Sequence, residues 1–133
     1  MNILIIDDSR FLRMANERAL TRVGHNVICA SDGEEGLRLA LERKPDLVVL
    51  DMLLPKLSGP DVLRAMRKAP ETKAIPVMVL TSLPQCNEEK LLGEGATAYF
   101  EKALLIVDKG SGPFVEAVER LLVKAAKAKT AAV

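Results

Sequence analysis

Short apolar runs alternate along the chain with longer segments in which apolar and polar residues are mixed. Runs rich in isoleucine, valine and leucine lie at residues 3–6, 27–30, 47–50 and 77–80, and a weaker run lies at 98–100. These runs are nearly continuous rather than alternating between polar and apolar positions, which is typical of strands covered on both faces. The pattern therefore predicts five buried strands.

Between these runs, apolar residues recur at the three- and four-residue spacing of an amphipathic helix. The apolar stripes consist of Leu12, Ala15, Ala19, Leu20 and Val23; Leu37, Ala40 and Leu41; Val62, Leu63 and Met66; and Phe114, Val118, Leu121, Leu122 and Ala125. A further helix at 87–93 is expected on the pair Leu91 and Leu92. Five strands alternating with five helices predict right-handed crossovers and a parallel sheet with helices on both faces, an α/β sandwich of three layers (α/β/α).

Turn and capping residues indicate where several of these helices begin and end. Gly24 follows the first stripe and is expected to close that helix. Ser31 and Glu34 have the spacing of a capping box ahead of the second helix. Pro60, which follows Ser58, is expected in the first turn of the third helix.

Composition indicates one ordinary globular domain. The chain has 133 residues, of which 49% are hydrophobic and 28% charged, with a net charge of +1. We expect a single domain over residues 1–123 and an alanine- and lysine-rich tail over 124–133. The near-zero charge provides no basic face for nucleic acid, and the longest apolar run, 103–107, is too short to cross a bilayer. The first residues lack the apolar core of a signal peptide, so we expect a cytoplasmic protein with no nucleic-acid or membrane partner.

Cysteine and histidine chemistry finds little support in the sequence. Cys29 and Cys86 do not have C-x-x-C spacing, and His25 is the one histidine in the chain. A zinc site or a histidine-based catalytic triad is therefore not expected.

Polar residues that can carry chemistry lie where four of the predicted strands end. Asp7 and Asp8 follow the first strand, Asp51 follows the third, Thr81 the fourth and Lys102 the fifth. Ligands of open parallel sheets bind beyond the carboxyl ends of the strands. If the first and third strands are neighbours, we expect these side chains to converge on one edge of the sheet.

Three neighbouring carboxylates repel one another unless a cation neutralises them, and oxygen ligands without nearby cysteine or histidine select a hard ion such as Mg²⁺. Mg²⁺ in turn indicates phosphate, and a carboxylate can attack phosphorus to form an aspartyl phosphate. Asp51 suits the nucleophile because a rigid strand aims it, whereas Asp7 and Asp8 suit the metal. Thr81 would hydrogen-bond one phosphoryl oxygen, and Lys102 would pair with another.

Each of these residues also has an ordinary explanation when it is taken alone. Asp8 can be a helix cap or an acid of the first helical turn, and Asp51 a turn residue ahead of Pro55. Thr81 can be a strand-end hydroxyl, and Lys102 a solvated charge. Their joint placement at the ends of different strands is what favours phosphate chemistry.

At these residues the chain resembles the receiver domain of two-component response regulators. The match is carried by Asp7, Asp8 and Ser9, by Asp51, Met52, Leu54, Pro55 and Gly59, by Thr81 and Ser82, and by the segment 95–102 with Tyr99, Phe100, Glu101 and Lys102. The similarity covers about residues 2–102. It implies a flavodoxin-like fold whose five parallel strands have the order 2-1-3-4-5, the order that chemotaxis receivers illustrate.

The resemblance implies a phosphoacceptor in a phosphorelay. Asp51 would be phosphorylated by a sensor histidine kinase or a histidine phosphotransfer protein. Mg²⁺ would be held by Asp8, Asp51 and the backbone carbonyl of Met52, and Asp7 would act partly through water. We therefore expect a signalling phosphoacceptor rather than an enzyme.

The resemblance also implies a switch with a protein-binding output. Thr81 would move toward the phosphoryl group, and Tyr99 would swing inward behind it. A downstream effector protein would then read a changed surface on the fourth helix, the fifth strand and the last helix. The first helix would be the docking face for the partner kinase, through Arg10, Phe11, Arg13 and Met14.

The sequence departs from the family pattern after its lysine. The family has a proline there, preceded by a cis peptide bond, whereas this chain has Ala103. A cis bond before a residue other than proline costs about 3 kcal/mol, so we expect a trans bond with a rearranged loop, or local strain. The connection 104–110 is also long, and we expect it to extend the fifth strand or to cover its edge.

Two rival functions lack residues that they need, and a third alternative stays open. Aspartate-nucleophile phosphatases need a second acid where Leu53 stands, and flavin binding needs a phosphate loop rich in serine, threonine and glycine where Asp7 and Asp8 stand. The alternative left open is a degenerate receiver that acts as a phosphorylation-independent protein-interaction module. In the family that the chain resembles, the positions of Leu53 and Leu83 flank the phosphoryl group. Apolar side chains there cannot orient an attacking water, so the resemblance implies slow loss of phosphate.

Overall fold

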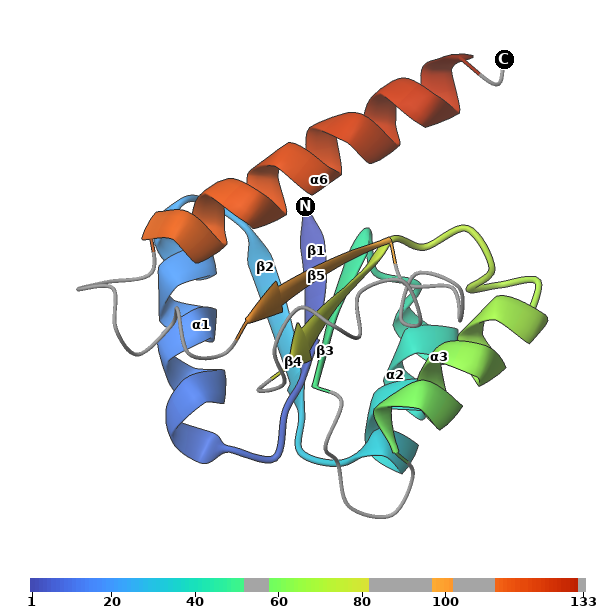
Figure 1. Ribbon diagram of the computed structural model, residues 1–133, viewed down its shortest axis with the longest axis horizontal. Helices are drawn as coiled ribbons and strands as arrows, with labels where there is room; N and C mark the ends of the chain where they lie inside the picture. The colour runs from blue at the N-terminus through green and yellow to red at the C-terminus, as the bar shows by residue number, and fades with distance from the viewer. Residues whose placement is uncertain (52–57, 82–96, 102–111, 132–133) are drawn as a thin grey trace.

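The computed structural model describes residues 1–51, 58–81, 97–101 and 112–131, and Figure 1 shows how the elements within these ranges are arranged. The strands are β1 (Asn2–Ile6), β2 (Asn26–Ala30), β3 (Leu47–Asp51), β4 (Val77–Thr81) and β5 (Ala98–Glu101). The helices are α1 (Arg10–Arg22), α2 (Gly33–Arg43), α3 (Gly59–Lys68) and α6 (Gly112–Ala131). Each predicted strand is present within one residue at either end. The expected helix at 87–93, Met52, Lys102 and the connection 104–110 lie outside the described residues.

The five strands form one parallel sheet with the order β2-β1-β3-β4-β5, which confirms the expected topology. The central strand pair brings Ile6 of β1 level with Leu50 of β3. On the other side of β3, Asp51 lies level with Leu80 of β4. The carboxyl ends of β1, β3 and β4 therefore meet at one edge of the sheet.

Helices cover the sheet on both faces, with α1 and α6 on one side and α2 and α3 on the other (Figure 1). Alternate residues of the same strand face opposite layers, because side chains along a strand point to alternate sides. Buried residues of the α2/α3 layer include Leu4, Ile6, Val48, Leu50, Val62, Leu63 and Met66. Those of the α1/α6 layer include Ile3, Ile5, Leu20, Val49, Val118 and Leu121. Burial on both faces explains why the strands read as continuous apolar runs.

The start of α2 corrects the sequence-based expectation. Asp32, not Ser31, caps this helix: its backbone is extended, and its carboxylate accepts a hydrogen bond from the Glu35 backbone N–H at 2.8 Å. The predicted capping box of Ser31 and Glu34 is therefore wrong by one residue. Ala30 still belongs to β2 and accepts a hydrogen bond from the Asp7 N–H, so the chain needs Ser31 to leave the sheet before the helix can begin.

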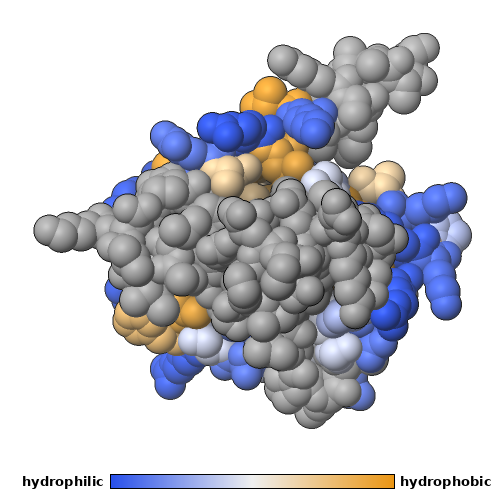
Figure 2. Space-filling model, in the orientation of Figure 1, coloured by the Kyte–Doolittle hydropathy of each residue, from blue (hydrophilic) through white to orange (hydrophobic). Residues whose placement is uncertain are grey.

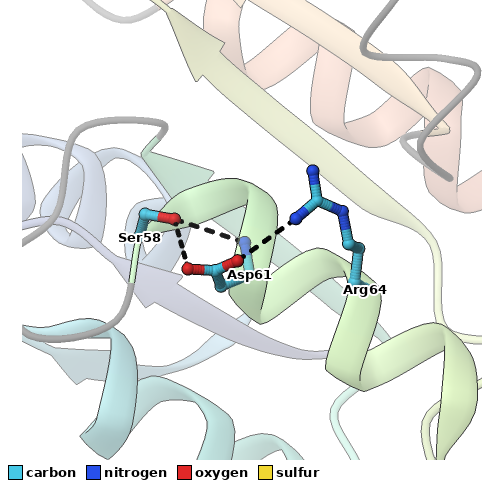
Figure 3. A network of polar contacts seen from close by, with 3 residues as sticks. All are labelled: Ser58, Asp61 and Arg64. Carbon is cyan, nitrogen blue, oxygen red and sulfur yellow. Dashed lines mark hydrogen bonds and ion pairs between the residues drawn. The ribbon is translucent and has the colours of Figure 1, made fainter.

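The other two predicted helix boundaries are confirmed. Gly24 follows α1 with a φ of 98°, in the left-handed region that glycine adopts without steric cost. Figure 3 shows the entry to α3, where the Ser58 hydroxyl donates to the Asp61 carboxylate at 2.9 Å and accepts from the Asp61 N–H at 3.4 Å. Arg64 pairs with the other oxygen of Asp61 at 3.2 Å, and Pro60 lies in the first turn as expected.

The last helix runs without a break past residue 124 to Ala131, so the expected boundary between domain and tail falls inside α6. That division of the chain stays a prediction. In the part of the chain that the structure describes, every helix is too short or too polar to span a bilayer. Hydrophilic side chains dominate the described surface in Figure 2, where apolar side chains show over α6 and beside α1. On α1 the exposed apolar residues are Phe11 and Met14.

Candidate functional site

Three carboxylates meet at the carboxyl ends of β1 and β3. Asp7, Asp8 and Asp51 each have an oxygen within 4.8 Å of the others. Asp7 and Asp51 are buried, whereas Asp8 is exposed. The register of β1 with β3 produces this arrangement. Ile6 pairs with Leu50, and the residues that follow them are Asp7 and Asp51. The structure therefore brings together the three acids that the sequence singled out.

The buried acid Asp7 is held through its amide, its side chain and its carbonyl. Its N–H donates to the Ala30 carbonyl at 3.1 Å, which ties it to the end of β2. Its carboxylate accepts from the Ser9 N–H at 2.9 Å, and its backbone carbonyl accepts from Nη1 of Arg13 at 2.8 Å. The turn between β1 and α1 is thus fixed from both the sheet and the helix.

Asp8 is not the cap of α1. Ser9 is the capping residue, and its hydroxyl accepts from the Leu12 N–H at 3.3 Å. The first turn of the helix contains no acid. Both ordinary explanations for Asp8, as a cap and as a first-turn acid, are therefore wrong, and its exposed carboxylate lies beside the other two without a role in capping.

Two further residues singled out in the sequence lie on the neighbouring strands. Thr81 is the last residue of β4, one position beyond the partner of Asp51, and lies level with Glu101 of β5. Tyr99 lies on β5 level with Val79. Lys102 and the carbonyl of Met52 lie outside the described residues, so their expected places at the site stay predictions.

The geometry of the acidic cluster fits a small, hard cation. Ligand oxygens around Mg²⁺ lie about 2.1 Å from the ion, so oxygens on the same ion lie roughly 3–4 Å apart. The carboxylate oxygens of Asp7, Asp8 and Asp51 lie within 4.8 Å of one another, which is close to that spacing. The described cluster offers oxygen atoms alone, which favours Mg²⁺ over zinc or other ions that prefer nitrogen or sulfur. A cation would also relieve the repulsion between the two buried carboxylates.

Cys29, one residue before Ala30 on β2, is unsuited to thiolate chemistry. Burial of the half-buried thiol, together with its hydrogen bond to Glu17 at 3.3 Å and the charge of that carboxylate, raises the pKa of Cys29 to about 12. Arg13 acts in the opposite direction. Because the thiolate is the reactive form, Cys29 stays protonated and inert near neutral pH.

This assignment predicts the effect of removing the Glu17 charge. In a Cys86→Ser background, Glu17→Gln is expected to speed alkylation of Cys29 by iodoacetamide at about pH 8 by roughly tenfold, because a lower thiol pKa raises the thiolate fraction. Mass spectrometry of the alkylated protein over time measures the rate. Glu42→Gln, which neutralises an exposed acid on α2, is the matched control and should leave the rate unchanged. Equal rates for all three proteins would show that Glu17 does not control the thiol.

The structure adds one residue to the site that the sequence did not indicate. The resemblance implies that Arg13 belongs to a docking face on the first helix, and the structure shows its side chain half-buried, with Nη1 donating to the Asp7 carbonyl. A signal is present in the sequence, because a cation in the first turn of a helix opposes the helix dipole and calls for a local partner. That partner is identified only by the fold.

Comparison with known proteins agrees with this geometry. A family model described as the response regulator receiver domain matches residues 3–107. Protein PilH of Pseudomonas aeruginosa is 38% identical over 102 residues, which cover 75% of this chain and 84% of PilH. The alkaline phosphatase synthesis transcriptional regulatory protein PhoP of Bacillus subtilis is 40% identical over 102 residues, or 75% of this chain and 41% of PhoP. The chain thus spans about two fifths of the length of that relative.

A solved structure shows the same architecture. The response regulator receiver domain protein from Clostridium thermocellum superimposes with a TM-score of 0.78 at 29% sequence identity. The superposition covers 99% of this chain and 98% of that one. The similarity therefore extends from the acidic cluster to the whole described fold.

Proposed function

This chain belongs to the response regulator receiver family of two-component systems, and from that premise we propose that Asp51 accepts a phosphoryl group from a phosphohistidine. The donor would be a sensor histidine kinase or a histidine phosphotransfer protein. The observation that carries the proposal is the buried Asp51 carboxylate at the end of a rigid strand, within 4.8 Å of two further acids.

The reaction is a transfer between two protein side chains. One carboxylate oxygen of Asp51 attacks phosphorus, the phosphorus–nitrogen bond of the phosphohistidine breaks, and the imidazole nitrogen keeps the electron pair and takes up a proton. The product is an acyl phosphate on Asp51. Rigid placement by β3, which is buried along its whole length, aims the nucleophile at the open edge of the sheet.

Asp7, Asp8, Asp51 and the carbonyl of Met52 would hold Mg²⁺ at this edge. When bound, Mg²⁺ neutralises the carboxylates and the charge that develops on the phosphoryl oxygens. Asp51 and Asp8 would be direct ligands, and Asp7 would contribute partly through water. Lys102 would pair with a phosphoryl oxygen and so stabilise the acyl phosphate.

The proposed output is a switch that another protein reads. Thr81, at the end of β4, would turn toward the phosphoryl group, and Tyr99 on β5 would move inward behind it. The surface formed by the segment before β5, β5 itself and α6 would then bind the downstream effector. The kinase or phosphotransfer protein would dock on α1, where Arg10, Phe11 and Met14 are exposed next to the acidic edge.

Intact-mass spectrometry tests the proposal. Incubation with acetyl phosphate and Mg²⁺ is expected to add the mass of one phosphoryl group, and the same incubation with a chelator is expected to add none. The fluorescence of Tyr99, the one tyrosine of the chain, is expected to change over the same period. After removal of the donor, the label should persist, because Leu53 and Leu83 cannot orient water; loss within seconds would contradict that part.

The same experiment separates a phosphoacceptor from a degenerate receiver. A chain that keeps its mass and its tyrosine fluorescence under all conditions would be a phosphorylation-independent interaction module. The reason to test this alternative is Ala103, which stands where the family has a proline directly after the lysine. A Mg²⁺-dependent gain of one phosphoryl group would exclude it.

A further inference from the structure

Arg13 reaches back from the first turns of α1 to the loop that carries two of the acids. Its Nη1 donates to the Asp7 carbonyl at 2.8 Å, six residues earlier in the chain. Side chains on a helix lean toward its N-terminus, and an arginine is long enough to span the turn of helix between its own position and the loop. The contact is partly buried, so it is not a solvent-exposed ion pair of little energetic consequence.

The contact is made to the carbonyl of a residue that lies between two regular elements. Asp7 follows the last residue of β1 and precedes Ser9, the cap of α1. Asp7 is fully buried, and a buried carbonyl needs a donor. A guanidinium supplies a charge-assisted hydrogen bond, which is stronger than one between neutral groups.

The position of Arg13 runs against local electrostatic preference. Glu34 and Glu35 lie in the first turn of α2, and Asp61 lies in the first turn of α3, as the helix dipole favours. The first turn of α1 has no acid and begins with Arg10. Cations at this end are unfavourable for the isolated helix, and the Asp7 carbonyl gives the Arg13 guanidinium a compensating acceptor.

We infer that Arg13 is a positioning residue that fixes the Asp7–Ser9 loop and thereby sets the spacing of the acids for the metal. The inference rests on the proposed function, in which these acids hold Mg²⁺. The amide and the side chain of Asp7 are fixed by Ala30 and Ser9, and Arg13 fixes its carbonyl. Loss of the contact from Arg13 removes a restraint on the peptide between Asp7 and Asp8, which lets the exposed carboxylate of Asp8 move relative to Asp51.

A titration with Mg²⁺ alone tests this role. In Arg13→Gln, which is too short to reach the carbonyl, the dissociation constant for Mg²⁺ is expected to rise about tenfold, corresponding to the loss of part of one charge-assisted hydrogen bond. Arg13→Lys, which keeps the charge but offers a single-point donor, is expected to show a smaller rise of about threefold. Isothermal titration calorimetry measures both constants.

Arg10→Gln is the matched control, because it removes one positive charge from the same helical turn at an exposed position. It is expected to bind Mg²⁺ as the unaltered chain does, or slightly more tightly. If Arg13 were merely a cation that competes with the metal, Arg13→Gln would bind more tightly than the unaltered chain. If Arg13 only stabilised the fold, thermal unfolding would shift while the Mg²⁺ affinity stayed the same. Either result would overturn the inference.

Hydrogen exchange in the metal-free protein provides a readout that does not depend on the metal. The Ser9 amide, which donates to the Asp7 carboxylate, is expected to exchange faster in Arg13→Gln than in Arg10→Gln. Unchanged exchange at Ser9 would also overturn the inference. Failure of the unaltered chain to bind Mg²⁺ would instead count against the proposed metal site, while the exchange measurement still reports on Arg13. If Arg13→Gln does not fold, Arg13→Lys carries both measurements.

Discussion

Asp51→Asn is expected to lower phosphorylation by acetyl phosphate and Mg²⁺ by at least about a hundredfold, to below detection in intact-mass spectra. The amide has nearly the shape of the carboxylate but lacks the anionic oxygen that attacks phosphorus. It also removes one negative charge from the cluster with Asp7 and Asp8, which weakens the site for a divalent cation. Both effects act in the same direction, so this substitution should have the largest functional effect of any at the site.

The fold should survive this change. Asp51 is buried beside the equally buried Asp7, and removing one of two close negative charges relieves repulsion in the metal-free protein. Thermal unfolding without Mg²⁺ is therefore expected at the same or a slightly higher temperature. A folded variant that cannot be phosphorylated would separate loss of the acceptor from loss of structure.

Asp46→Asn is the control for this experiment. Asp46 lies just before the other end of the same strand, where its carboxylate accepts from the Asn2 N–H at 2.8 Å, far from the acidic edge. It changes the same chemical group without touching the site, so phosphorylation should proceed as in the unaltered chain. Phosphorylation that persists in Asp51→Asn would identify another acceptor and refute the assignment.

Gly36→Ala is expected to lower the free energy of unfolding by about 1–2 kcal/mol, although alanine is the better helix former. A Cβ atom at this position of α2 would lie 2.5 Å from Cδ1 of Ile6, 2.7 Å from Cγ1 and 2.8 Å from Cγ2. Ile6 is fully buried among the residues between the sheet and the α2/α3 layer, so its side chain has little room to move. Because three atoms would lie closer than 3.0 Å, we expect an overpacking cost in the upper part of the usual range, about 2–3 kcal/mol, which exceeds the gain in helix propensity of about 1 kcal/mol.

A double-mutant cycle with Ile6→Ala shows whether the contact is the cause. Ile6→Ala alone is destabilising because it opens a cavity, but in its presence Gly36→Ala should be neutral or stabilising. Urea unfolding curves of the four proteins give the coupling energy. Additive effects of the two substitutions would show that the close approach of α2 to β1 does not limit residue 36. Ile6 directly precedes Asp7 in the chain. The Gly36→Ala single variant, which displaces the Ile6 side chain, is therefore also expected to weaken Mg²⁺ binding.

Much of the architecture could be predicted because it is encoded locally. The continuous apolar runs indicated strands buried on both faces, and parallel strands with helical crossovers bring their carboxyl ends to one edge. Asp7 and Asp51 could therefore be expected at the same edge, on the condition that the first and third strands are neighbours. The helix ends marked by Pro60 and Gly24 could also be predicted, since a proline in the first helical turn and a closing glycine depend on a few neighbouring residues.

Other features could not be predicted, because they depend on which segments pack against each other. Ser31 and Asp32 are both good capping residues, and the length of β2 decided between them. Nothing within α1 showed that Arg13 would meet a carbonyl of the preceding loop, or that Glu17 would meet Cys29 of β2.

The sequence by itself determined the element types, their order and the identity of the acids, because periodicity and residue chemistry are properties of short stretches of chain. Only the tertiary structure decided how close the acids lie, that Asp8 is free of helix capping, and that residue 36 has room for no side chain beyond hydrogen. These features depend on register and on the approach of helix to sheet, where distances of a few ångström are set by the packing of residues far apart in sequence.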